Sequence, residues 1–242
     1  MNKKRLLALI LALMMVFALF ACGDEDYYVE DEDEDEEETT QVTTEATEAT
    51  TEATTEATEE VTEPTQAAPA TILGSWNGNV YTNENIGFRM TLPAGWTYTS
   101  SPVSDPLNPF GGQTQITDFT AGDSNAQASI NALYQNPLYS ASVYNKSQTE
   151  EQNVEALLTS KDMLIQTYES MGYTVEFLDK ATATLMGQEH TVVKTVITVQ
   201  GITATIYQFI LFGEAEAPMI LTITAGSGEE GLAALLEIFT PI

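Results

Sequence analysis

The sequence predicts an α+β domain over residues 72–242, in which an antiparallel β-sheet is packed with helices on its faces. Several segments alternate apolar and polar residues with the period of two that is typical of half-buried strands. One longer segment between them repeats apolar residues at helical spacing. The last strands are apolar at successive positions, which indicates that both faces of the sheet are covered.

Two strands are predicted before the helical segment. Phe88, Met90 and Leu92 alternate with polar residues, so residues 87–92 form a strand. Residues 125–135 alternate in the same way and form another strand. The segment 100–115 between them is rich in proline and glycine and is predicted to be a loop.

One long helix is expected to follow. Its apolar residues recur at helical spacing: Val154, Leu157, Leu158, Leu164, Ile165, Tyr168 and Met171. Either Thr149 with Gln152 or Ser147 with Glu150 can form its capping box, and Gly172 is suited to end it.

Five more strands and a closing helix complete the predicted domain. The strands are expected at residues 173–178, 181–186, 190–199, 202–212 and 218–224. Gln200 and Gly201 form a two-residue hairpin signal. An amphipathic helix carries Leu232, Leu235, Leu236 and Phe239, and Ser227 with Glu230 is its expected capping box.

The segment from Asn85 to Trp96 resembles the opening signature of PsbP-like domains. It has a Gly-Phe start at Gly87-Phe88, a short alternating strand and a Pro-x-Gly-Trp end at residues 93–96. Leu185-Met186-Gly187 followed by Glu189, a long hairpin and a C-terminal helix also fits, so the resemblance covers about residues 74–242. It implies an α-β-α sandwich with a binding or assembly role and supplies no catalytic residues.

The N-terminal 21 residues have the layout of a secretory signal peptide. Lys3, Lys4 and Arg5 precede an apolar run over residues 6–20. Leu19-Phe20-Ala21-Cys22 resembles the lipobox of bacterial lipoproteins, which implies cleavage before Cys22 and attachment of at least a diacylglyceryl group to it. The alternative, a retained transmembrane helix, needs about 20 apolar residues. The sequence therefore favours a lipid anchor at Cys22 on the extracytoplasmic face of the cell membrane, and the composition of residues 22–71 resembles that of a Gram-positive surface protein.

Residues 22–71 are expected to form a disordered acidic tether. From Gly23 to Thr71 there are 19 acidic residues and no Lys or Arg, with near-repeats of Thr-Glu-Ala. Asp31, Asp33 and Asp35 alternate like calcium ligands of an EF-hand, but Glu36 stands where that loop needs glycine. The spacer interpretation is preferred, and no metal or cofactor is predicted.

The domain lacks a recognisable catalytic motif. Its 17 acidic and five basic residues argue against binding to nucleic acid. His190 is the only histidine, and no Gly-x-Ser-x-Gly elbow accompanies it. Trp76 and Trp96 can either stack on sugars or pack in the core, and the sequence leaves this open.

Tyr134, Tyr139 and Tyr144 are the candidate binding residues, because tyrosine, asparagine and serine on a loop form an adaptable contact surface. The alternative is that they pin the loop to the domain. We expect a non-catalytic module that binds a protein, a cell-wall component or a small molecule. An exported hydrolase with an unrecognised site is the alternative, and a solute-binding subunit is disfavoured because 171 residues give one lobe.

Overall fold

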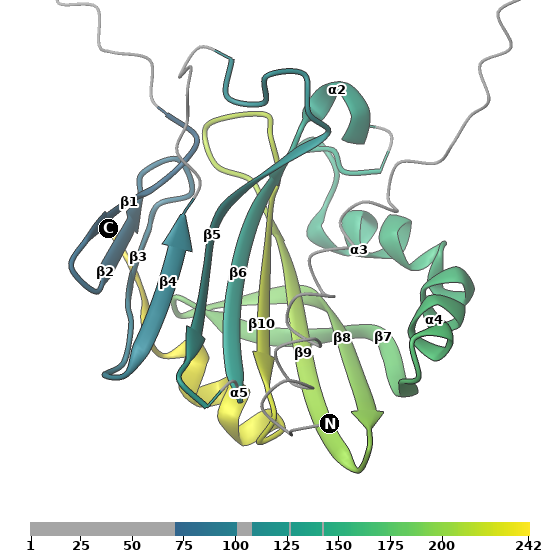
Figure 1. The fold of residues 1–242 in the computed structure, drawn as a ribbon. Coiled ribbons are helices and arrows are strands. Elements are labelled where there is room, and N and C mark those ends of the chain that lie inside the picture. The colour runs from purple at the N-terminus through teal and green to yellow at the C-terminus, as the bar shows by residue number, and fades with distance from the viewer. Residues whose placement is uncertain (1–70, 101–107, 126, 142) are drawn as a thin grey trace, which may run out of the picture. The chain divides into compact units, whose positions relative to one another are not determined.

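The computed structural model describes residues 71–100, 108–125, 127–141 and 143–242. The described residues do not include the predicted signal peptide over residues 1–21 or the predicted lipidation site at Cys22. Of the predicted acidic tether over residues 22–71, they include only Thr71. The described chain forms two antiparallel sheets with few helices, one of four strands and one of seven (Figure 1). An antiparallel sheet is confirmed, whereas the second sheet was not predicted.

The four-stranded sheet joins the start of the domain to its end. Its strands are β1 (Ser75–Asn77), β2 (Val80–Asn83), β3 (Phe88–Thr91) and β11 (Phe239–Pro241), in the order β1-β2-β3-β11. β3 confirms the strand predicted at residues 87–92. Phe239 pairs with Met90 in this sheet, so its prediction as part of the closing helix is wrong.

The seven-stranded sheet has the order β4-β5-β6-β10-β9-β8-β7. Its strands are β4 (Trp96–Ser100), β5 (Gln115–Asp123), β6 (Ala128–Gln135), β7 (Thr174–Leu185), β8 (Gln188–Val199), β9 (Ile202–Leu211) and β10 (Met219–Ala225). The hairpin predicted at Gln200-Gly201 is confirmed, since both residues have positive φ, at 50° and 77°.

The two strands predicted at residues 173–178 and 181–186 are one continuous strand, β7. Asp179 and Lys180 separate the apolar runs and suggested a turn, but they pair with Lys194 and Val193 of β8. β7 is an edge strand, where charged side chains stay in contact with solvent and discourage pairing with another chain.

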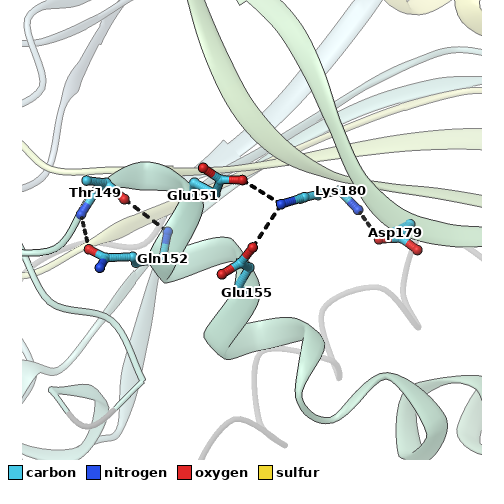
Figure 2. Close-up of polar contacts among 6 residues, drawn as sticks. All are labelled: Thr149, Glu151, Gln152, Glu155, Asp179 and Lys180. Carbon is cyan, nitrogen blue, oxygen red and sulfur yellow. Dashed lines mark hydrogen bonds and ion pairs between the residues drawn. The ribbon is translucent and has the colours of Figure 1, made fainter.

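Four short helices accompany the sheets in the described part of the chain: α2 (Pro137–Ser140), α3 (Glu150–Leu158), α4 (Lys161–Ser170) and α5 (Glu229–Leu236). The predicted single long helix is therefore wrong, because a turn at Thr159 and Ser160 separates α3 from α4. The capping box of α3 is formed by Thr149 and Gln152, not by the alternative pair (Figure 2). The box expected for the closing helix is also wrong, since the N-cap of α5 is Gly228, which has no side chain to form a cap.

The two faces of the large sheet pack against different partners. On one face of β6, Leu133 contributes to the cluster that contains Val154 of α3. On the other face, Ala132 and Tyr134 pack with residues of β2, β3, β11 and α5. Helices α3 and α4 thus cover one face, whereas the small sheet and α5 share the other. The expected sandwich with helices on both faces is therefore matched only roughly, because a second sheet makes up much of one layer.

Ion pairs attach α3 and α4 to the edge of the large sheet. Lys180 Nζ lies 2.5 Å from Glu151 Oε1 and 2.8 Å from Glu155 Oε1 (Figure 2). Lys161 Nζ lies 2.9 Å from Asp179 Oδ2. Hydrogen bonding to Glu151 raises the pKa of Lys180, and hydrogen bonding to Lys161 lowers the pKa of Asp179. Each exposed ion pair of this kind contributes little to the free energy of unfolding, so these pairs orient the helices more than they stabilise them.

Candidate binding groove

A groove of about 490 Å³ lies between the β7–β8 hairpin and the C-terminal segment. One wall comes from residues 182–187 at the hairpin end, and Tyr207 of β9 lies beside it. The other wall comes from α5 and β11: Glu229, Ala233, Leu236, Glu237, Phe239 and Pro241. Its size and mixed lining match those of small-molecule sites, which are mostly apolar and carry a few polar groups.

The turn of the hairpin places a methionine at the groove. Met186 and Gly187 join β7 to β8 and have φ values of 54° and 78°. A two-residue turn with both φ values positive favours Asn-Gly, and a bulky residue with φ above zero is strained. Met186 nevertheless occupies the first position, where it lines the groove and packs against the main core. Methionine suits this place because its flexible side chain adapts to irregular surfaces.

Both charged residues that line the groove are acidic. Glu229, at the first position of α5, forms an ion pair with Lys194 Nζ. Glu237, at the opposite end of α5, is exposed and has no ion-pair partner among the described residues. The pKa of Tyr207 is raised by burial first and then by the charge of Glu229, which outweighs the opposing effect of Lys194.

All four lysines of the domain are already paired with carboxylates. Lys146 lies 3.9 Å from Glu216, and Lys161, Lys180 and Lys194 have the partners given above. Among the basic side chains of the described residues, Arg89 on β3 alone is without a carboxylate partner, so this surface offers little free positive charge to an anionic ligand.

A buried polar network, which the sequence did not reveal, links the two sheets. Asp118 of β5 is 1% exposed and accepts hydrogen bonds from the Tyr81 hydroxyl and from the Gly74 N–H, the latter at 3.3 Å. Asn83 of β2 donates to Asp118 at 3.2 Å and to the Tyr134 hydroxyl at 3.0 Å. Burial raises the pKa of Asp118 to about 6, although its hydrogen bonds act in the opposite direction.

A β-bulge brings Asp118 into this network. The pairing of β5 with β6 shifts between Thr117 and Phe119, which leaves Asp118 as the extra residue. Both Asp118 and Phe119 are consequently buried. Asp118 is enclosed by its partners, so we interpret the network as a structural link between the sheets.

His190 is buried at the contact between α3 and β8. Its Nδ1 lies 2.7 Å from Glu150 Oε1, and its ring meets Phe209 edge to face at 5.9 Å between centroids. Its Nε2 is buried without a hydrogen-bond partner among the described residues. Glu150 also accepts from the Thr191 N–H at 3.1 Å, so this contact holds the start of α3 against β8.

The three candidate tyrosines do not share a surface. Tyr134 lies in β6 and is fully buried, and Tyr144 is only 5% exposed, so both contradict the expectation of an exposed loop surface. The Tyr134 hydroxyl accepts hydrogen bonds from the side-chain amides of Asn83 and Asn85, at 3.0 and 3.2 Å, and Tyr144 packs in the cluster that contains Val154 of α3. Tyr139, on α2, is 49% exposed, and its binding role stays a prediction.

Both tryptophans pack against the main core of the domain. Trp76 stacks on Tyr98 with ring centroids 3.7 Å apart and meets Phe119 edge to face at 5.5 Å. Trp96 also packs against the main core. Because the Trp76 ring is already in contact with other rings, stacking on a sugar would require these contacts to open.

In the described part of the chain, no group of three or more histidine, cysteine, aspartate or glutamate side chains is arranged to hold a metal ion. None of its helices has both the length and the apolar character needed to cross a membrane.

Comparison with known proteins leaves the family open. No protein-family model and no curated protein sequence matches the chain. Among solved structures, cyanobacterial PsbP (CyanoP) from Synechocystis sp. PCC 6803 is 11% identical with a TM-score of 0.42, covering 70% of this chain and 99% of that one. A protein from Bacteroides thetaiotaomicron VPI-5482 is 11% identical with a TM-score of 0.31, covering 64% of this chain and 45% of that one. At these scores neither likeness assigns a family or a function.

Proposed function

We propose that this protein is a lipid-anchored extracytoplasmic surface protein whose domain binds a ligand and does not catalyse a reaction. The observation that carries the binding role is the groove between the β7–β8 hairpin and the α5–β11 segment. It combines an apolar interior with a few polar groups, as ligand sites do. The PsbP-like signature at residues 85–96 supports the same kind of role.

The anchoring part of the proposal depends on the N-terminal sequence. The charged start, the apolar run and the lipobox-like ending at Cys22 support export and lipidation. A thioether-linked diacylglyceryl group would give the two acyl chains that stable attachment needs. The acidic segment that follows would act as a spacer between the lipid and the domain.

The groove can be tested with an uncharged probe, 2-phenylethanol. We would measure saturation-transfer NMR on the purified full chain in zwitterionic lipid nanodiscs, with empty nanodiscs subtracted. Ala233→Trp fills the groove from α5, where Ala233 is exposed, and should abolish the signal. Met186→Trp fills it from the opposite wall and guards against a folding defect in the first variant.

Two outcomes would reject the proposal. Binding that persists in both filled variants would place the probe elsewhere. Hydrolysis of p-nitrophenyl acetate above the buffer rate, lost in His190→Ala while melting is unchanged, would instead support the hydrolase alternative.

A further inference from the structure

The polarity of the groove narrows the class of ligand beyond the function proposed above. Its apolar surface comes from Ala183 and Met186 on the hairpin side and from Leu236 and Phe239 on the C-terminal side. Its uncharged polar groups include Thr182, Thr184 and Tyr207. A ligand that fits must therefore have a mainly apolar body. The acidic residues of the lining determine which ligand charge is favoured.

Glu237 occupies an unfavourable position for a carboxylate. It is the C-cap of α5, and the last turn of that helix contains no basic residue. The C-terminal end of a helix carries a partial negative charge, so an acidic side chain there is destabilising and a cation is stabilising. Its sequence neighbours Leu236 and Ile238 are apolar and supply no compensating charge. A positive group in the groove would meet the carboxylate and the helix end together.

At the opposite end of the groove, Glu229 is paired with Lys194, which offsets its negative charge. Glu237 is the acidic side chain of the lining that has no ion-pair partner among the described residues. Tyr207 adds a half-buried aromatic ring to the lining, and aromatic rings attract cations. Among the described residues, no lysine or arginine lines the groove.

We propose that the groove binds small amphipathic cations, that is, amines or quaternary ammonium compounds with an apolar body, and excludes their anionic counterparts. This inference rests on the proposed function, because it requires that the groove bind a ligand. The apolar walls hold the body of the ligand, and Glu237 with the end of α5 holds its positive group.

Three probes with one skeleton test the charge preference. Phenethylammonium, 2-phenylethanol and 3-phenylpropanoate share a phenylethyl group and differ in charge. Each is titrated at pH 7.5 into the full chain in zwitterionic nanodiscs, with ligand-observed NMR and empty nanodiscs as the blank. We expect the cation to bind best and the carboxylate worst, and we expect this order to weaken as salt is added.

Glu237→Gln isolates the contribution of the free carboxylate. It should weaken the binding of phenethylammonium about threefold, because a single exposed charge pair contributes only modestly to affinity, and leave the binding of 2-phenylethanol unchanged. Glu169→Gln is the matched control, because Glu169 is an exposed carboxylate on α4 that does not line the groove. It should leave all three affinities unchanged.

The outcomes separate the charge preference from the groove itself. Equal affinities for the three probes, all lost in Ala233→Trp and Met186→Trp, would overturn the preference for cations and keep the groove as a ligand site. A cation preference that survives Glu237→Gln would also overturn the role of Glu237. Absence of binding by all three probes, or binding unaffected by both filled variants, would overturn the proposed groove as well.

Discussion

Replacing Asp118 with asparagine should remove a large part of the pH dependence of stability between pH 4 and pH 7. Asp118 is buried, and burial raises its pKa from 3.8 to about 6. Within that window the folded protein retains the proton that the unfolded chain releases, so the free energy of unfolding falls as pH rises. The loss of stability caused by ionising Asp118 in the folded protein is absent below about pH 4 and complete above about pH 7.

The expected size follows from the shift in pKa. One pKa unit corresponds to about 1.36 kcal/mol, so a change from 3.8 to about 6 gives about 3 kcal/mol. The amide introduced by Asp118→Asn cannot ionise, so the variant should lack this pH dependence. The wild type should therefore lose about 3 kcal/mol relative to Asp118→Asn as pH rises from 4 to 7, whatever constant difference the lost hydrogen bonds add.

Urea unfolding followed by tryptophan fluorescence measures this difference. Trp76 packs against Phe119, the neighbour of Asp118, and reports on this part of the core. Glu169→Gln is the control, because an exposed carboxylate should give a nearly constant difference from wild type. A difference between wild type and Asp118→Asn that stays flat from pH 4 to 7, or that changes with the opposite sign, would refute the reasoning. Carboxyl ¹³C NMR would give the pKa of Asp118 directly.

Three further predictions concern the backbone, the anchor and the domain. Gly213→Ala should destabilise the protein by about 3 kcal/mol or more in urea unfolding, because a Cβ there would lie 1.8 Å from the Asn85 carbonyl oxygen. Gly122→Ala is the control, because its Cβ would come no closer than 3.5 Å to its nearest neighbour. Similar small losses of stability in both variants would contradict the clash. Cys22→Ala should release the chain from the membrane fraction, and a variant still cleaved after Ala21 and still bound there would contradict lipidation. Residues 72–242 should unfold cooperatively in urea with the same midpoint with and without reductant, because the only cysteine is Cys22; a missing transition would mean that the domain boundary is misplaced.

Local patterns in the sequence predicted those elements that depend on neighbouring residues. The capping box at Thr149 and Gln152 and the turn at Gln200-Gly201 are both present, because caps and two-residue turns are decided by a few adjacent side chains and φ angles. The alternation at residues 87–92 likewise predicted β3, since one face of that strand is buried and the other exposed. Local reasoning failed where a polar residue looked like an interruption, as at Asp179 and Lys180 in β7.

The features that distinguish this domain depend on contacts between distant segments. β1 and β2 have only three and four residues, too few for a clear pattern, and their sheet is completed by β11 from the other end of the domain. Asp118 is buried because of a bulge in its pairing with β6, and Tyr134 faces the small sheet because of its register in β6. The groove requires the β7–β8 hairpin to meet α5 and β11. Sequence alone determined the periodicity of the strands, the cap of α3 and the N-terminal signal-like layout. Tertiary structure decided which polar groups are buried and where a ligand can fit, because burial depends on what each face packs against.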